Sequence, residues 1–200
     1  MNRIVDYYMT PLSPWTFLGH GRLRELCARY NADIRIKPVD MGARVLPAGG
    51  GVPLAKRTPQ RKTYRLVELQ RWSALREVSL NLHPKHFPVP SDDACRLIIA
   101  AVLEAGQDAG FGLAERLMQA VWQQERDISD TPTLRAIAHE AGLDADALMR
   151  RIPDTHQVYE ANTQEALDRH VFGVPWYQFR DEPFWGQDRL ELLEQALARP

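Results

Sequence analysis

The alternation of apolar and polar residues predicts a strand, a helix and a second strand at the start of the chain. Ile4–Met9 is a short apolar run with β-branched and aromatic residues, which is typical of a buried strand. Apolar residues between Trp15 and Tyr30 recur on one face of a helix. Asp33–Val39 then alternates polar and apolar positions, with Pro38 at the edge or end of the predicted strand. This order is a βαβ unit, whose crossover is right-handed if the strands are parallel.

Helical spacing of apolar residues dominates the middle of the chain, from Arg61 to about His170. A stretch rich in proline and histidine at 80–90 separates the first predicted helix from the others. The predicted helices cover residues 64–75, 92–105, 113–122, 131–142, 144–152 and 155–170. Ser91 is the predicted N-cap of the second helix, and either Asp154 or Thr155 that of the last.

The end of the chain returns to β character. Trp176–Phe179 is typical of a strand, Arg180–Pro183 of a turn, and Phe184-Trp185 of a second short strand. Arg189–Ala198 is predicted to form a closing helix whose apolar residues pack on a sheet.

These patterns predict an α/β fold in the order β-α-β, a helical block, then β-β-α. The two ends of the chain together make one four-stranded sheet flanked by helices. We therefore expect one domain built from residues 1–60 and 171–200, and a helical insertion domain at 61–170.

Composition and charge exclude several classes of partner. Among 200 residues, 25 Lys and Arg stand against 26 Asp and Glu, for a formal net charge of −1. A charge so near zero does not favour nucleic acid or an anionic membrane surface as a partner. No apolar run is long enough to span a membrane, and the first residues lack the apolar segment of a signal peptide.

Cysteine and histidine spacing indicates a reduced protein without a metal. Cys27 and Cys95 form no C-x-x-C motif, and Cys27 falls on the apolar face of the first helix, where we expect it in the core. The expected location is the reducing cytoplasm. His83 and His86 have no Cys, Asp or Glu at a ligand spacing, so no metal site is predicted.

The stretch Asp40–Lys62 is rich in glycine, proline and basic residues, and we expect little regular structure at its centre. A loop of this length in a compact domain is usually functional or disordered. Two interpretations stay open. The stretch is either a mobile lid that supplies cations to an anionic ligand, or a solvated flexible insertion.

Ser13 and Pro14 are the residue types preferred at the N-cap and first position of a helix. Free backbone N–H groups and the positive end of the helix favour an anion there, including a thiolate. The alternative interpretation is a plain N-cap serine.

Two motifs near the C-terminus are candidates for ligand binding. A cis bond between Val174 and Pro175 would leave the Val174 N–H and C=O free to pair with an extended peptide ligand. Gly186-Gln187-Asp188 at a helix start could bind an anion, and Asp188 could bind an ammonium group. The alternatives are an ordinary turn proline, a tight turn at the glycine, and an acidic residue that complements the helix dipole.

Together these motifs resemble those of the 2-hydroxychromene-2-carboxylate isomerase family, which is related to kappa-class glutathione transferases and DsbA-type thioredoxin-fold oxidoreductases. They occur in the right order over nearly the whole chain. The motifs are Ser13-Pro14-Trp15, Leu69-Gln70-Arg71-Trp72, Val171–Pro175 and Phe184–Leu190.

The resemblance implies a thioredoxin-like fold with a large helical insertion, glutathione as cofactor, and a small aromatic carboxylate as substrate in aromatic catabolism. Ser13 takes the family's catalytic serine position, beside the glutathione sulfur. The family isomerases carry a lysine shortly after the second strand, for which Arg44, Lys56 and Arg57 are the candidate substrate-binding replacements. The implied glutathione-binding residues are Ser13, Val174, Pro175, Trp185, Gly186, Gln187 and Asp188.

The expected reaction is reversible addition of the glutathione thiolate to the substrate, with isomerisation. Ser13 and Thr16 stand where dithiol oxidoreductases carry cysteines, which argues against disulfide exchange. Trp176 follows the proline where many members carry a small polar residue. The alternatives are a glutathione transferase that consumes glutathione and a non-catalytic glutathione-binding module. The resemblance allows a homodimer, and neither a nucleic acid nor a membrane is expected as a partner.

Overall fold

The two ends of the chain build the only sheet in the described part of this computed structural model, residues 3–199. The strands are β1 (Ile4–Met9), β2 (Asp33–Pro38), β3 (Trp176–Phe179) and β4 (Glu182–Trp185), in the order β2-β1-β3-β4. β1 and β2 are parallel, whereas β3 pairs antiparallel with β1 and β4 pairs antiparallel with β3. The predicted four-stranded sheet is confirmed.

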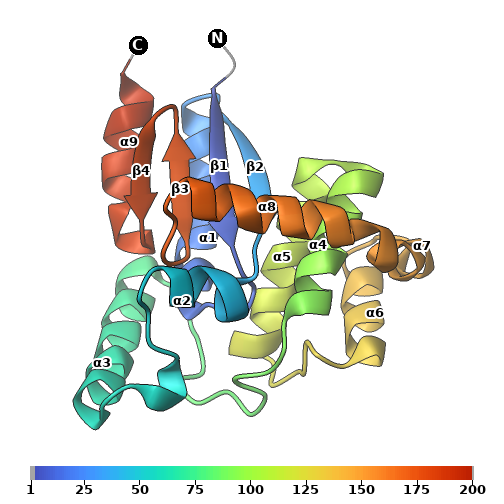
Figure 1. Ribbon diagram of the computed structural model, residues 1–200, viewed down its shortest axis with the longest axis horizontal. Helices are drawn as coiled ribbons and strands as arrows, with labels where there is room; N and C mark the ends of the chain where they lie inside the picture. Colours follow the sequence, from blue (N-terminus) through green and yellow to red (C-terminus); the bar gives the residue numbers. More distant parts are fainter. Residues whose placement is uncertain (1–2, 200) are drawn as a thin grey trace.

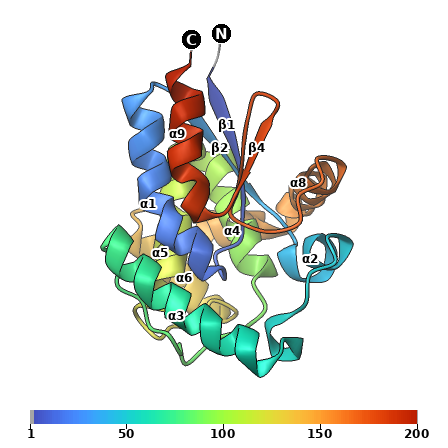
Figure 2. The same ribbon diagram turned by 90° about the vertical axis from the view of Figure 1, so that its left-hand side faces the viewer.

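Helices cover both faces of this sheet and extend beyond it. They are α1 (Pro14–Arg29), α2 (Leu46–Ala48), α3 (Pro59–Arg76), α4 (Asp92–Ala105), α5 (Gln107–Trp122), α6 (Thr131–Glu140), α7 (Ala145–Arg151), α8 (His156–Asp168) and α9 (Leu190–Ala198). α1 and α9 lie on one face and α8 crosses the other, while α3 lies beyond the end opposite the termini (Figures 1 and 2). Within residues 3–199, none of the helices combines the length and the apolarity needed to cross a membrane.

The segment after β2 has more regular structure than its glycines and prolines predicted. Met41–Val45 forms a π-helical turn that runs directly into α2, and Leu54–Lys56 forms a 3-10 turn. α3 already begins at Pro59, because the Thr58 hydroxyl caps its first turn. The centre of Asp40–Lys62, residues 49–53, forms no helix or strand, as expected, whereas the parts on either side of it are helical.

The hairpin between β3 and β4 is tighter than predicted. Glu182 pairs with Phe179, so the turn consists of Arg180 and Asp181 alone, and Arg180 has a positive φ of 55°. The prediction of a four-residue turn missed the first half of β4, because proline is tolerated in an edge strand.

Two predicted N-cap side chains do not cap their helices. Ser91 and Thr155 precede α4 and α8 as expected, but neither forms a capping hydrogen bond. The Ser91 Oγ lies 3.3 Å from the Thr10 Oγ1, and the Thr155 Oγ1 donates to the Ile152 carbonyl at 2.6 Å.

Alternate residues of β1 face two separate hydrophobic clusters. Val5, Tyr7 and Met9 belong to the main core, and Tyr8 belongs to a smaller cluster with residues of α8. Cys27 is buried in the main core, as predicted, and burial raises the pKa of its thiol to about 12. The main core also contains residues of α4 to α7, so the sheet and the inserted helices share it. The division into two domains stays a prediction.

His20 of α1 is a buried neutral side chain in this core. Its Nε2–H donates to the Phe111 carbonyl at 3.1 Å, which leaves Nδ1 to accept from the Tyr7 hydroxyl at 3.1 Å. Burial lowers the pKa of His20 from 6.5 to about 3, against the opposing effect of the Phe111 carbonyl. The imidazole is therefore uncharged at neutral pH.

We expect the free energy of unfolding to fall as the pH drops from about 6.5 toward 3. Over that range the unfolded chain binds a proton at His20 that the folded chain does not, which costs about 1.4 kcal/mol per pH unit. Urea unfolding of the unmodified protein and of His20→Gln between about pH 6 and pH 4 measures this contribution. Equal pH slopes for the two proteins would contradict it.

Candidate active site

Ser13 lies at the N-terminus of α1, beside the segment that precedes β3. Its Oγ accepts a hydrogen bond from the Thr16 N–H at 3.2 Å, so it is the N-cap of the helix. The same hydroxyl donates to the Val174 carbonyl at 3.5 Å. The Val174–Pro175 peptide bond is cis, as predicted. The fold thus brings together two candidate residues that are far apart in the sequence.

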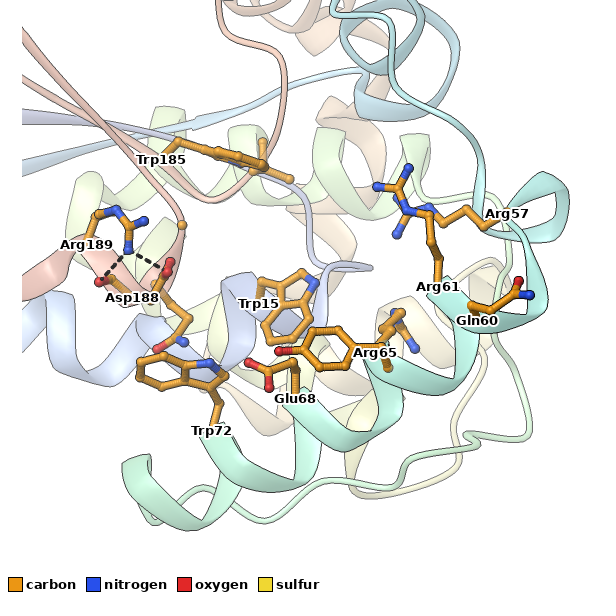
Figure 3. Close-up of a pocket in the computed structure, with 14 residues that line it drawn as sticks. Trp15, Arg57, Gln60, Arg61, Arg65, Glu68, Trp72, Trp185, Asp188 and Arg189 are labelled. Carbon is orange, nitrogen blue, oxygen red and sulfur yellow. Dashed lines mark hydrogen bonds and ion pairs between the residues drawn. The ribbon is translucent and has the colours of Figure 1, made fainter.

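A cavity of about 660 Å³ lies between α3 and the segment 185–189 (Figure 3). We call it the first cavity. In Figure 3, Arg65, Glu68 and Trp72 project from α3 on one side, and Trp185 and Asp188 lie on the other. Of the predicted glutathione-binding residues, this cavity is lined by Val174, Trp185, Gly186, Gln187 and Asp188.

A second cavity of about 540 Å³ adjoins the first and is lined by Ser13. The two cavities share the lining residues Trp15, Arg57, Arg61, Arg65, Val174 and Trp185. Phe87 and Phe172 line the second cavity only, and Gly186–Arg189 line the first only. Two ligands bound in these cavities would therefore meet near Ser13 and Val174.

Aromatic side chains form one wall of the second cavity. Phe172 and Trp185 contact each other edge to face, with ring centroids 4.6 Å apart. A Cβ atom at Gly173 would lie 2.5 Å from the Trp185 Nε1, which is too close for any other residue without displacing the indole. The close approach of Trp185 therefore explains why residue 173 is a glycine. The Trp185 side chain is itself 52 % exposed, so it is available to a ligand.

Three arginines follow one another where the two cavities meet. Arg57, Arg61 and Arg65 line both cavities, and none forms an ion pair within the described part of the chain. Burial and the charge of Arg57 lower the pKa of Arg65 to about 10, and burial and Arg61 lower the pKa of Arg57. Three neighbouring cations without a counterion favour an anionic ligand.

The structure does not bring the other two predicted cations to these cavities. The Arg44 guanidinium donates to Glu160 at 2.7 Å and to Gln164 at 2.8 Å, both on α8. Lys56 is exposed and lines neither cavity. Sequence reasoning missed Arg65 as a site residue, although Arg61 and Arg65 have the four-residue spacing that places side chains on one side of a helix.

The segment that begins at Gly186 has the conformation of a tight turn. Gly186 has a φ of 98°, which favours glycine, and its N–H donates to the Pro175 carbonyl at 2.9 Å. The Arg189 Nη1 donates to the Asp188 Oδ2 at 2.6 Å and to the Asp188 carbonyl at 3.2 Å, as the two dashed lines in Figure 3 mark. This ion pair was not predicted, and both of its side chains remain exposed to solvent.

The far wall of the second cavity carries polar groups that sequence reasoning did not select. The Tyr159 hydroxyl of α8 donates to the Asp92 Oδ1 of α4 at 3.1 Å, and both residues line the cavity. No sequence motif marks the pair, because it forms only when two helices pack together.

The described residues supply no dithiol to this site. Ser13 and Thr16 supply no sulfur, and Cys27 and Cys95 are buried and unpaired. Burial raises the pKa of each thiol to about 12, so neither ionises near neutral pH. The helix terminus at Ser13 can instead stabilise a thiolate supplied by a ligand.

Comparisons with known proteins place the chain in a family. A profile described as the DSBA-like thioredoxin domain matches residues 4–198. The chain is 32 % identical over 199 residues to a 2-hydroxychromene-2-carboxylate isomerase of Sphingobium xenophagum, covering 98 % of this chain and 99 % of that protein. It is 23 % identical to glutathione S-transferase kappa 1 of Rattus norvegicus, over 98 % of this chain and 91 % of that one.

A solved structure agrees with these sequence relationships. The structure of a 2-hydroxychromene-2-carboxylate isomerase superimposes with a TM-score of 0.79 at 29 % identity, covering 98 % of this chain and 95 % of that one. The predicted thioredoxin-like fold is confirmed, and the relatives named here are enzymes. The chain therefore belongs to the DSBA-like thioredoxin-domain family, and within it to the family of the 2-hydroxychromene-2-carboxylate isomerases.

Proposed function

We propose that this protein is a glutathione-dependent isomerase of small aromatic carboxylates of the 2-hydroxychromene-2-carboxylate type. The observation that supports it best is the junction of the two cavities beside Ser13, at a helix N-terminus and 3.5 Å from the Val174 carbonyl. One cavity has the groups that suit glutathione, and the other has those that suit an aromatic anion. The name of one relative contains 2-hydroxychromene-2-carboxylate and that of another contains glutathione, so both ligands are consistent with the relatives.

The polar groups of the first cavity match the polar groups of glutathione. Asp188 offers a carboxylate to the γ-glutamyl ammonium group. The Val174 N–H forms no hydrogen bond to any described residue, so it is free to pair with the extended backbone of the cysteinyl unit. The γ-glutamyl end is also bound by Trp185, Gly186 and Gln187. Pro175 follows Val174, the residue that pairs with the cysteinyl unit. These residues fit the cofactor.

Bound glutathione would supply a thiolate nucleophile that adds reversibly to the substrate and is regenerated. Ser13 donates its hydroxyl hydrogen to that sulfur, while its own Oγ stays oriented by the Thr16 N–H. Ser13 acts as a hydrogen-bond donor and not as an acylating nucleophile, because no histidine or acidic side chain hydrogen-bonds to it in the described structure.

The second cavity positions the substrate. Phe87, Phe172 and Trp185 offer apolar ring faces and edges to an aromatic body. The arginines at the junction, Arg57 and Arg61 among them, bind its carboxylate.

Incubation of the protein with glutathione and 2-hydroxychromene-2-carboxylate tests this function. We expect isomerised product with no loss of glutathione, followed by liquid chromatography and mass spectrometry. Consumption of glutathione with a stable conjugate would instead identify a transferase. Binding of glutathione without turnover of this substrate or of model electrophiles would identify a binding module.

Arg57 and Lys56 are adjacent in the chain but differ in their relation to the cavities. Replacing Arg57 by glutamine should raise the KM for the anionic substrate about tenfold, the scale of one lost charged hydrogen bond. Lys56→Gln is the matched control and should leave the KM unchanged, since Lys56 lines neither cavity. Initial rates at low and high salt measure both variants. An equal effect of the two changes would indicate only a diffuse charge effect.

We place the enzyme in the cytoplasm, because its two cysteines are buried and unpaired. The homodimer and the role in aromatic catabolism stay predictions.

A further inference from the structure

Arg76, the last residue of α3, joins the two sides of the first cavity. Its Nε donates to the Gln187 side-chain Oε1 at 2.9 Å, and its Nη2 donates to the Gln187 backbone carbonyl at 2.9 Å. Its Nη1 donates to the Glu191 Oε1 at 2.6 Å. The guanidinium also lies over the Trp72 ring, 5.3 Å from the centroid, and Trp72 lines the cavity.

These contacts matter because α3 buries few of its own side chains. Leu69 is the one residue of α3 that is buried. Arg76 itself has a side chain only 11 % exposed, although its partner Glu191 is half exposed. The Arg76 hydrogen bonds thus tie the end of α3 directly to Gln187.

The contact with Gln187 also determines which end of its amide faces the ligand. A guanidinium has only donors, so the Gln187 oxygen must point to Arg76 and the NH₂ group must point elsewhere. Gln187 is 2 % exposed and lines the first cavity, and its NH₂ group donates to no described residue. Because Gln187 and Asp188 both line the first cavity, this amide donor is available to a ligand that also contacts the Asp188 carboxylate.

We propose that Arg76 is a positioning residue that orients Gln187, so that the Gln187 NH₂ group and the Asp188 carboxylate together recognise an α-amino acid headgroup. The NH₂ group donates to the α-carboxylate of the ligand, and Asp188 accepts from its α-ammonium. This inference rests on the proposed use of glutathione and assigns to Arg76 the selection of its γ-glutamyl end. It predicts that Arg76 controls which thiol is bound, although Arg76 itself lines neither cavity.

Selectivity between two thiols separates this role from a merely structural one. Cysteinylglycine lacks the γ-glutamyl unit of glutathione, so its binding does not use Gln187 or Asp188. Titration calorimetry gives the Kd of cysteinylglycine divided by the Kd of glutathione, which measures the preference for glutathione. In Arg76→Met we expect this ratio to fall about tenfold, toward unity. The Kd of cysteinylglycine should stay unchanged. A weakening of both thiols by the same factor would mean that Arg76 only stabilises the fold.

Arg126→Met is the matched control. Arg126 also contacts a glutamate and a glutamine, with Nη1 2.7 Å from Glu140 and 3.5 Å from Gln124, but lies away from both cavities. The variant should keep the full preference for glutathione.

Gln187→Glu tests the same idea without removing Arg76. Glutamate keeps an oxygen for the guanidinium but replaces the amide donor by a second acceptor. The Tm of Gln187→Glu should equal that of the unmodified protein, while its preference for glutathione falls about tenfold. Retention of that preference in Arg76→Met or in Gln187→Glu would overturn the inference and leave the proposed function intact. A lack of glutathione binding by the unmodified protein would overturn both.

Discussion

Replacement of Ser13 by alanine is expected to lower turnover by about ten- to a thousand-fold while leaving the protein folded. The hydroxyl lies at the start of α1, where it donates toward the Val174 carbonyl in the free protein; in the proposed complex it donates to the glutathione sulfur instead. Loss of one donor to a reacting anion has an effect of this size. The thiol pKa of bound glutathione should rise in the variant, because the thiolate loses its charge-assisted hydrogen bond. The ultraviolet absorbance of the thiolate as a function of pH measures that shift.

The same substitution removes a helix cap, which costs about 1 kcal/mol of stability. Asp130→Ala provides the matched control, because Asp130 caps α6 by accepting from the Thr133 N–H at 2.9 Å. Asp130 lines neither cavity, so this variant should lose similar stability and keep its turnover. Unchanged turnover in Ser13→Ala with glutathione bound would remove the catalytic assignment of the serine.

Asp188→Asn is expected to weaken glutathione binding by about 1–3 kcal/mol, the scale of a hydrogen bond to a charged group. In the free protein Asp188 pairs with Arg189, but both side chains are largely exposed, and such pairs contribute little. The γ-glutamyl ammonium can therefore compete with Arg189 for the carboxylate. The KM for the second substrate should change little, because Asp188 lines the first cavity only.

Two comparisons make the Asp188 experiment specific. Glutathione acetylated on its α-amino group has no ammonium, so its affinity should be the same for Asp188→Asn and for the unmodified protein. Asp181→Asn changes an exposed aspartate in the turn between β3 and β4 and should leave the glutathione affinity as it is. If titration calorimetry finds the same glutathione Kd for Asp188→Asn and the unmodified protein, Asp188 does not bind the γ-glutamyl end.

The elements of the fold could be predicted because their signals are local. The apolar run of β1 and the apolar face of α1 mark the side chains that are buried within each element. The start of α1 is encoded by Ser13-Pro14 alone, since capping involves only neighbouring backbone groups. The extent of the loop after β2 was overestimated, because glycine and proline mark the ends of short helical turns as well as irregular chain.

The sequence by itself determined the strands, most helices, the cis proline candidate and the resemblance that assigns Ser13 and Asp188. Only the tertiary structure decided which cations meet the cavities. Arg44 pairs with α8, whereas Arg57 and Arg65 remain without a counterion at the junction. The contact between Arg76 and Gln187 likewise spans 111 positions of sequence. Such pairs depend on how helices pack across the whole core. Side-chain periodicity indicates only which face of an element is buried, so a short sequence pattern cannot predict which distant residues will meet.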